Sequence, residues 1–84
     1  MELLTRQEIN DLPEYSIIRQ HSFGKFGYKQ VLDIYVLNIH GVRKYCYKRY
    51  DGKWEETFLR RNARYELIKR GNDNEKNKSD NQKT

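Results

Sequence analysis

Two turn signals, His40-Gly41 and Asp51-Gly52, constrain the fold of this chain more than any other feature. Each places glycine where a two-residue hairpin loop requires a positive φ, which glycine adopts without steric cost. The residues on either side of the two signals form three strand-like segments between Val31 and Phe58. The sequence therefore predicts an antiparallel β-meander over roughly residues 28–58.

Two-residue loops would also fix the register of these strands, because every cross-strand pair follows by counting outward from a turn. The pairs next to the turns are then Ile39 with Val42 and Tyr50 with Lys53. The same count places Asp33, Lys48 and Glu55 side by side, in one row of alternating charge across the sheet.

The register divides the side chains between two faces, and a slip of one residue would exchange them. We expect the inner, apolar face to carry Leu32, Ile34, Val36, Tyr45, Tyr47, Trp54 and Phe58. We expect the outer face to carry Asp33, Tyr35, Lys44, Cys46, Lys48, Tyr50, Lys53 and Glu55. The count also places Arg49 beside Trp54, and Tyr45 opposite Phe58.

Two further elements are expected before the meander. Thr5 and Glu8 have the spacing of a capping box, which predicts a short helix that ends before Pro13. Residues 15–21 alternate in polarity and predict a strand. Residues 22–27, with two glycines and two phenylalanines, predict a loop.

Residues 59–70 fit either a helix or a strand. Leu59, Ala63 and Leu67 have helical spacing, with basic residues in the last turn and Gly71 as a stop signal. As a strand, the segment turns Tyr65 and Leu67 inward and can pair with the first strand. We favour the strand, because three strands leave an apolar face uncovered whereas five can close a small barrel.

The length of 84 residues predicts one domain with a small core. We place this domain at residues 1–70 and expect residues 71–84, which contain no apolar side chain, to form a disordered tail. A single cysteine excludes an internal disulfide, and no Cys/His spacing predicts a metal site. Without a long apolar run or a signal-peptide pattern, we expect a soluble, cytoplasmic protein with no cofactor.

The net charge of +5 belongs to the folded body, because the acids and lysines of the tail cancel. Basic residues gather in residues 60–70, whereas acidic residues gather in residues 1–14. This distribution predicts a localised basic surface.

The segment Leu12 to Arg19 (LPEYSIIR), the aromatic-rich meander and the closing YELIKR resemble the short β-roll or SH3-like accessory proteins of phages of low-GC bacteria. The resemblance covers about residues 3–70. It implies an SH3-like barrel and a protein that acts by binding a host enzyme or a nucleic-acid complex.

The sequence offers little for catalysis. His21 and His40 lie in or beside predicted turns, without a partner whose approach follows from spacing. Cys46 lies between two tyrosines in a strand, where no helix N-terminus or histidine would activate it. The glycines of the loop do not have phosphate-loop spacing. We therefore expect a binding module and no enzyme.

Two classes of ligand remain. A protein partner is the first, because tyrosine, tryptophan and arginine dominate interface hot spots and open strand edges can pair with a host protein or with a second copy. Nucleic acid, single-stranded or duplex, is the alternative, because aromatic rings interleaved with lysines stack bases and hold phosphates. The binding residues expected for either ligand are Tyr35, Lys44, Tyr50 and Lys53 on the sheet, Phe23, Lys25 and Phe26 in the loop, and Arg60, Arg61 and Arg64.

Overall fold

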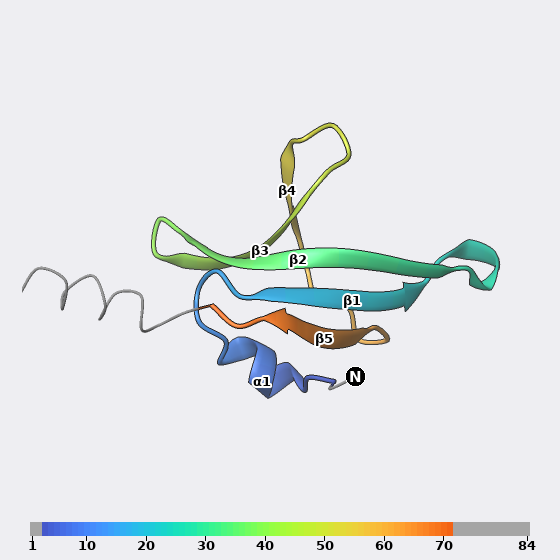
Figure 1. Cartoon of the computed structure of the whole chain (residues 1–84), viewed down its shortest axis with the longest axis horizontal. Helices are drawn as coiled ribbons and strands as arrows, with labels where there is room; N and C mark the ends of the chain where they lie inside the picture. Colours follow the sequence, from blue (N-terminus) through green and yellow to red (C-terminus); the bar gives the residue numbers. More distant parts are fainter. Residues whose placement is uncertain (1–2, 72–84) are drawn as a thin grey trace, which may run out of the picture.

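A computed structural model of the chain describes residues 3–71 and consists of one antiparallel sheet and one short helix. The helix is α1 (Arg6–Asn10), and the strands are β1 (Ile17–Phe23), β2 (Lys29–Ile39), β3 (Val42–Lys48), β4 (Trp54–Thr57) and β5 (Arg64–Lys69). The strand order is β4-β3-β2-β1-β5 (Figure 1). The expected mainly β meander is confirmed. The sheet does not close into a barrel, because its outer strands β4 and β5 do not pair.

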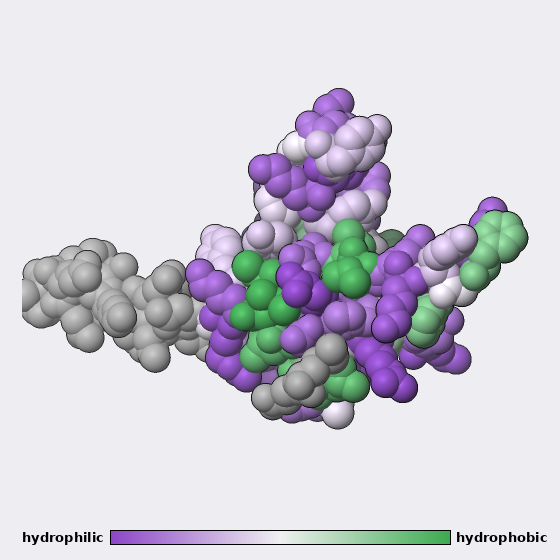
Figure 2. Space-filling model, turned by 45° about the vertical axis from the view of Figure 1, so that its right-hand side comes forward, coloured by the Kyte–Doolittle hydropathy of each residue, from purple (hydrophilic) through white to green (hydrophobic). Residues whose placement is uncertain are grey.

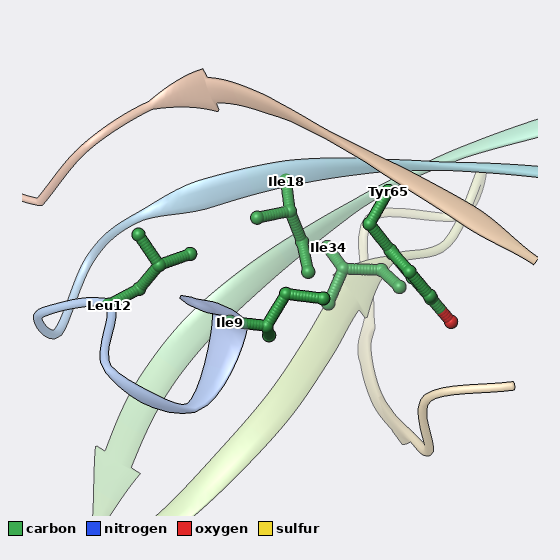
Figure 3. Packing of buried hydrophobic residues seen from close by; sticks show 5 residues of the cluster. All are labelled: Ile9, Leu12, Ile18, Ile34 and Tyr65. Atoms are coloured by element: carbon green, nitrogen blue, oxygen red, sulfur yellow. The ribbon is translucent and has the colours of Figure 1, made fainter. Parts of the chain in front are cut away.

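The helix covers the inner face of the sheet and completes the core. The expected capping box is present: the Thr5 hydroxyl accepts a hydrogen bond from the Glu8 N–H (3.1 Å), and the Glu8 carboxylate accepts one from the Thr5 N–H (2.8 Å). Five buried side chains then meet between the helix and the strands, namely Ile9, Leu12, Ile18, Ile34 and Tyr65 (Figure 3). Buried and less buried residues alternate along β1 and in the middle of β2, so each strand turns one face toward the core; in β1 that face also carries the polar Gln20 and Ser22.

Residues 59–70, for which the sequence allowed a helix or a strand, contain the strand β5 and no helix. β5 pairs antiparallel with β1, and Tyr65 and Leu67 turn toward the core as the strand alternative predicted. Burial on the sheet therefore outweighs the helical spacing of the leucines. Residues at the start of the described chain lie against β5, because Leu4 N–H donates to the Tyr65 carbonyl (2.8 Å) and Leu3 bridges Glu66.

The β2–β3 hairpin has the predicted turn and register. His40 and Gly41 both have positive φ (54° and 77°), as a two-residue turn requires. Ile39 pairs with Val42, and the ladder continues to the pair of Tyr35 and Cys46.

The predicted register of β3 and β4 is wrong by one residue. The hairpin closes between Arg49 and Lys53, so its loop has three residues and not two: Arg49 N–H donates to the Lys53 carbonyl (2.7 Å), and Gly52 N–H donates to the Arg49 carbonyl (2.9 Å). Gly52 has a φ of 85°, as the last position of a three-residue hairpin loop requires. Lys48 therefore pairs with Trp54, and Tyr45 pairs with Thr57.

This shift exchanges the two faces of β4 and removes the row of Asp33, Lys48 and Glu55. Asp33 instead binds Arg19 of β1 (2.7 Å), and Glu55 lies beside Arg49 (3.7 Å) and accepts a hydrogen bond from the Tyr47 hydroxyl. The β4 tryptophan and the residue after the strand also lie elsewhere than predicted: Trp54 is on the outer face, away from Arg49, and Phe58 lies beyond β4 and is 76% exposed.

The described part of the chain ends in a tight contact. Gly71 is buried, and its N–H donates to the Ser16 hydroxyl (2.7 Å), which donates in turn to the Pro13 carbonyl (2.6 Å). The tail was expected to begin at residue 71, but Gly71 packs against the fold, and residues 72–84 lie outside the described residues. Within residues 3–71, no helix is long and apolar enough to cross a membrane.

Candidate nucleic-acid interface

Two residues expected to bind a ligand on the outer face, Tyr35 and Lys44, are engaged within the protein. The Tyr35 ring packs edge-on against Trp54, with the ring centroids 5.0 Å apart and an interplanar angle of 87°. The ammonium group of Lys44 lies 3.3 Å from the Glu56 carboxylate. Both contacts follow from the actual β3–β4 register, which brings Trp54 and Glu56 to this face. At these positions the outer face therefore presents a packed aromatic ring and an ion-paired lysine.

Tyr50 and Lys53 do not lie on the sheet face as predicted. Tyr50 is in the three-residue loop between β3 and β4 and is 99% exposed, and Lys53 closes the same loop. In Figure 1 this turn projects away from β2. The sheet-face site is therefore split between a strand pair and a distant turn.

The other expected binding residues lie together at one end of the sheet. The β1–β2 turn carries Lys25 and leads into Lys29, and the β4–β5 loop carries Arg60 and Arg61 and leads into Arg64. We call the surface formed by these five exposed cations the basic end. The loop lies near the end of β1 and the start of β2 because His21 of β1 pairs with Arg64 at the start of β5.

An open groove of about 340 Å³ lies between the ends of β1 and β2 and the β4–β5 loop. Its walls include Phe23, Lys29, Gln30, Val31, Asn62 and Arg64. The groove thus combines aromatic, aliphatic and amide side chains with two cations of the basic end. A groove of this composition offers stacking surfaces, phosphate ligands and hydrogen-bonding groups to one extended ligand.

The basic end has an uncompensated positive charge. Residues 20–32 and residues 57–65 contain no aspartate or glutamate. Among residues 3–71, the ion pairs within 4 Å involve Arg19, His21, Lys44 and Arg49, and none of the five cations of the basic end. Cations that no neighbouring carboxylate neutralises remain available to an anionic ligand.

Exposed aromatic rings accompany these cations. Phe23, Phe26 and Tyr28 are 68%, 93% and 71% exposed, and all three belong to the β1–β2 turn or its flanks. In Figure 2, apolar atoms project at the tip on the right, where Figure 1 places this turn. Phe23 and Phe26 were expected as binding residues, whereas Tyr28 and Lys29 were not.

A buried hydroxyl positions the β4–β5 loop. The Tyr65 hydroxyl donates to the Gln20 side chain (2.7 Å) and accepts a hydrogen bond from the Arg60 N–H (2.7 Å). Burial raises the pKa of Tyr65 above its ordinary value of 10.0. The neutral phenol therefore links the core to the start of the arginine cluster.

The side chains considered for catalysis have structural partners. Cys46 is buried between its strand neighbours Tyr35 and Glu56, and burial, followed by the Glu56 charge, raises the pKa of its thiol. That direction disfavours the reactive thiolate. His21 lies 3.0 Å from the Glu66 carboxylate. Within residues 3–71, no group of three His, Cys, Asp or Glu side chains is arranged to hold a metal ion.

The residues expected from the sequence include the arginines and both phenylalanines of this surface, but not Tyr28, Lys29 and Asn62, which lie on the same surface. The signal that would have found them is the absence of acidic residues from residues 20–32 and 57–65. Comparisons with protein-family models, curated proteins and solved structures found no match to this chain.

Proposed function

We propose that the protein is a small non-enzymatic binding module that holds nucleic acid at its basic end. The single observation that carries this proposal is the groove between the ends of β1 and β2 and the β4–β5 loop, where the exposed ring of Phe23 lies beside Lys29 and Arg64, which make no ion pair within residues 3–71. Lys25, Lys29 and the three arginines supply phosphate contacts, and the rings supply stacking surfaces. An accessory role beside nucleic-acid-processing proteins, in a phage or another setting, agrees with this ligand and stays a prediction.

The proposal requires binding that depends on charge at this place. The double variant Arg60→Gln/Arg61→Gln removes two cations of the basic end. The measurement is the fluorescence anisotropy of a labelled 20-nucleotide oligonucleotide, single-stranded and duplex, over a series of salt concentrations. We expect the affinity to fall roughly tenfold, and the slope of log K against log salt to decrease by about 1.5, because two phosphate contacts are lost.

Lys44→Gln/Lys53→Gln is the matched control, since it removes the same charge from the outer face and the β3–β4 loop. We expect its affinity to stay within about twofold of wild type, because this pair makes no phosphate contact in the proposal. Equal losses in both double variants would show that net charge, and not the basic end, drives binding. No binding to either oligonucleotide at about 50 mM salt would overturn the proposal.

A second candidate function is the binding of an extended segment of a partner protein, and an open strand edge favours it. β2 pairs with β3 only from Tyr35 to Ile39, although its pairing with β1 continues to Lys29. The backbone groups of Val36 bond toward the β1 side, and successive residues of a strand point to opposite edges. The N–H and C=O groups of Val31 and Asp33 therefore point to the edge of β2 opposite β1, where β3 no longer pairs with it.

The side chains at this edge define the partner segment. A notch of about 310 Å³ lies there, lined by Val31, Leu32, Asp33, Tyr35, Lys48 and Arg19. Arg19 neutralises Asp33, whereas Lys48 makes no ion pair among the described residues. An acidic segment that adds as a strand fits both the free backbone groups and the charge.

Val31→Pro tests the edge, because it removes the outward N–H without removing a bond to β1. Capture from a nuclease-treated lysate identifies the partner, and amide hydrogen exchange then locates it. We expect wild type, but not the variant, to retain the partner, and the amides of Val31 and Asp33 to exchange at least tenfold more slowly in the complex. Unchanged exchange at these two amides, or capture that nuclease abolishes, would count against strand addition. Protection in the purified protein at high concentration would identify the partner as a second copy.

A further inference from the structure

Phe26, at the tip of the β1–β2 turn and next to Lys25 of the basic end, has a backbone conformation that is unusual for a bulky residue. Its backbone is left-handed (φ 64°, ψ 18°), and Gly27 after it is left-handed as well (φ 77°). A left-handed conformation brings Cβ close to the carbonyl oxygen, so bulky residues rarely adopt it. Glycine or asparagine would form this turn at lower cost.

The phenylalanine ring gains nothing from the described fold that would offset this strain. It is 93% exposed, and it takes part neither in the core cluster nor in an aromatic pair within residues 3–71. Phe26 therefore combines a strained backbone with an exposed apolar ring. Strain of this kind persists mainly where function requires it.

The surroundings of the ring indicate what it binds. Lys25 precedes Phe26, Tyr28 and Lys29 follow it, and the exposed Phe23 lies before the turn. Single-strand binding proteins combine cations that hold phosphates with aromatic rings on which bases stack, and both kinds of side chain occur here. In a single strand the face of a base is free to stack on a side chain. In a duplex the neighbouring base pairs stack on both faces and cover them.

We propose that the ligand of the basic end is single-stranded nucleic acid and that Phe26 stacks on an unpaired base. This inference rests on the proposed function, because the cations of the basic end supply the phosphate contacts. Phe26 then sets the preference for single strands over duplexes, while Arg60 and Arg61 contribute to binding of both.

The variant Phe26→Asn separates binding from folding, because asparagine adopts the left-handed conformation and lacks the ring. We expect the melting temperature to rise by about 4 to 8 °C as the strain is relieved. We expect the affinity for a 20-nucleotide oligothymidine to fall about 5- to 100-fold, the range for one lost stacking contact. The affinity for a duplex of equal length should change less than twofold.

Three further variants sharpen the test. Tyr50→Asn removes an equally exposed ring from another turn and should bind like wild type. Phe26→Trp should bind single strands as tightly as wild type or more tightly, because indole stacks at least as well as benzene. Phe26→Leu keeps apolar bulk but has no aromatic face, so it should bind single strands as weakly as Phe26→Asn.

The outcomes distinguish this inference from the proposed function. Binding of both nucleic acids without a single-strand preference, or with equal affinity in Phe26→Asn and wild type, would overturn the stacking role alone. Wild-type affinity of Phe26→Leu for oligothymidine would also overturn it, because apolar bulk would then suffice without an aromatic face. If neither nucleic acid binds at about 50 mM salt, the proposed function itself fails.

Discussion

Gly71 shows how a single residue holds the end of the fold in place. A Cβ atom at this position would lie 1.9 Å from the Glu14 carbonyl oxygen and 2.8 Å from the Ser16 nitrogen, which leaves room for no side chain. The contact fastens the chain after β5 to the segment between α1 and β1. Its tightness comes from backbone atoms, so a neighbour cannot move aside as a flexible side chain would.

We therefore expect Gly71→Ala to lower the free energy of unfolding by about 1 to 3 kcal/mol, the range for overpacked sites. Urea unfolding followed by circular dichroism measures this change. Ser16→Ala serves for comparison, because it removes the hydrogen bond to Gly71 without crowding the contact. It should lower the free energy of unfolding by about 1 kcal/mol. A Gly71→Ala protein as stable as wild type would mean that the contact is looser than described.

At the scale of elements, the two hairpins show why one register could be predicted and the other could not. Between β2 and β3, His40 and Gly41 both have positive φ and occupy the two central positions of the turn, as predicted. Asp51 and Gly52 fit two loops, because glycine is also suited to the last position of a three-residue loop. The sequence does not distinguish these loops, and one extra residue exchanges the faces of β4.

The same shift explains which parts of the candidate interface were predictable. The contacts of Lys44 and Tyr35 depend on the residues opposite them, so these contacts could not be predicted without the β4 register. Arg60, Arg61 and Phe26 lie in a turn and a loop, where exposure follows from local composition and needs no register. The β4–β5 loop lies near the ends of β1 and β2 because β5 pairs with β1, and the strand alternative for residues 59–70 predicted this pairing.

For the whole molecule, burial of two weak acids makes stability depend on pH. Burial is the main cause that raises the pKa of Tyr65 from 10.0 and the pKa of Cys46 from 9.0. The folded state thus holds these protons more tightly than the unfolded state does. The stabilising effect is fully present below the ordinary pKa of each group and is lost as the pH rises through the higher folded value.

We expect the free energy of unfolding to fall between pH 7 and about pH 10.5, and to fall less steeply in Tyr65→Phe. At pH 7 this variant should be less stable by about 1 to 3 kcal/mol, because the buried Gln20 side chain and the Arg60 N–H lose a partner. Urea unfolding at both pH values measures the two effects. Tyr50→Phe is the control and should follow wild type, since that ring is 99% exposed. If Tyr65→Phe shows the same pH dependence as wild type, groups other than Tyr65 cause the loss of stability at alkaline pH.

The position of Gly71 also has a practical consequence for handling the protein. The glycine is fixed beside Ser16, just before β1, whereas the basic end lies at the other end of that strand. Seven residues at about 3.3 Å each separate the two points by roughly 23 Å. A tether attached beyond Gly71 therefore emerges on the opposite side from the groove, so immobilising the chain on a sensor surface there leaves the groove facing the solution.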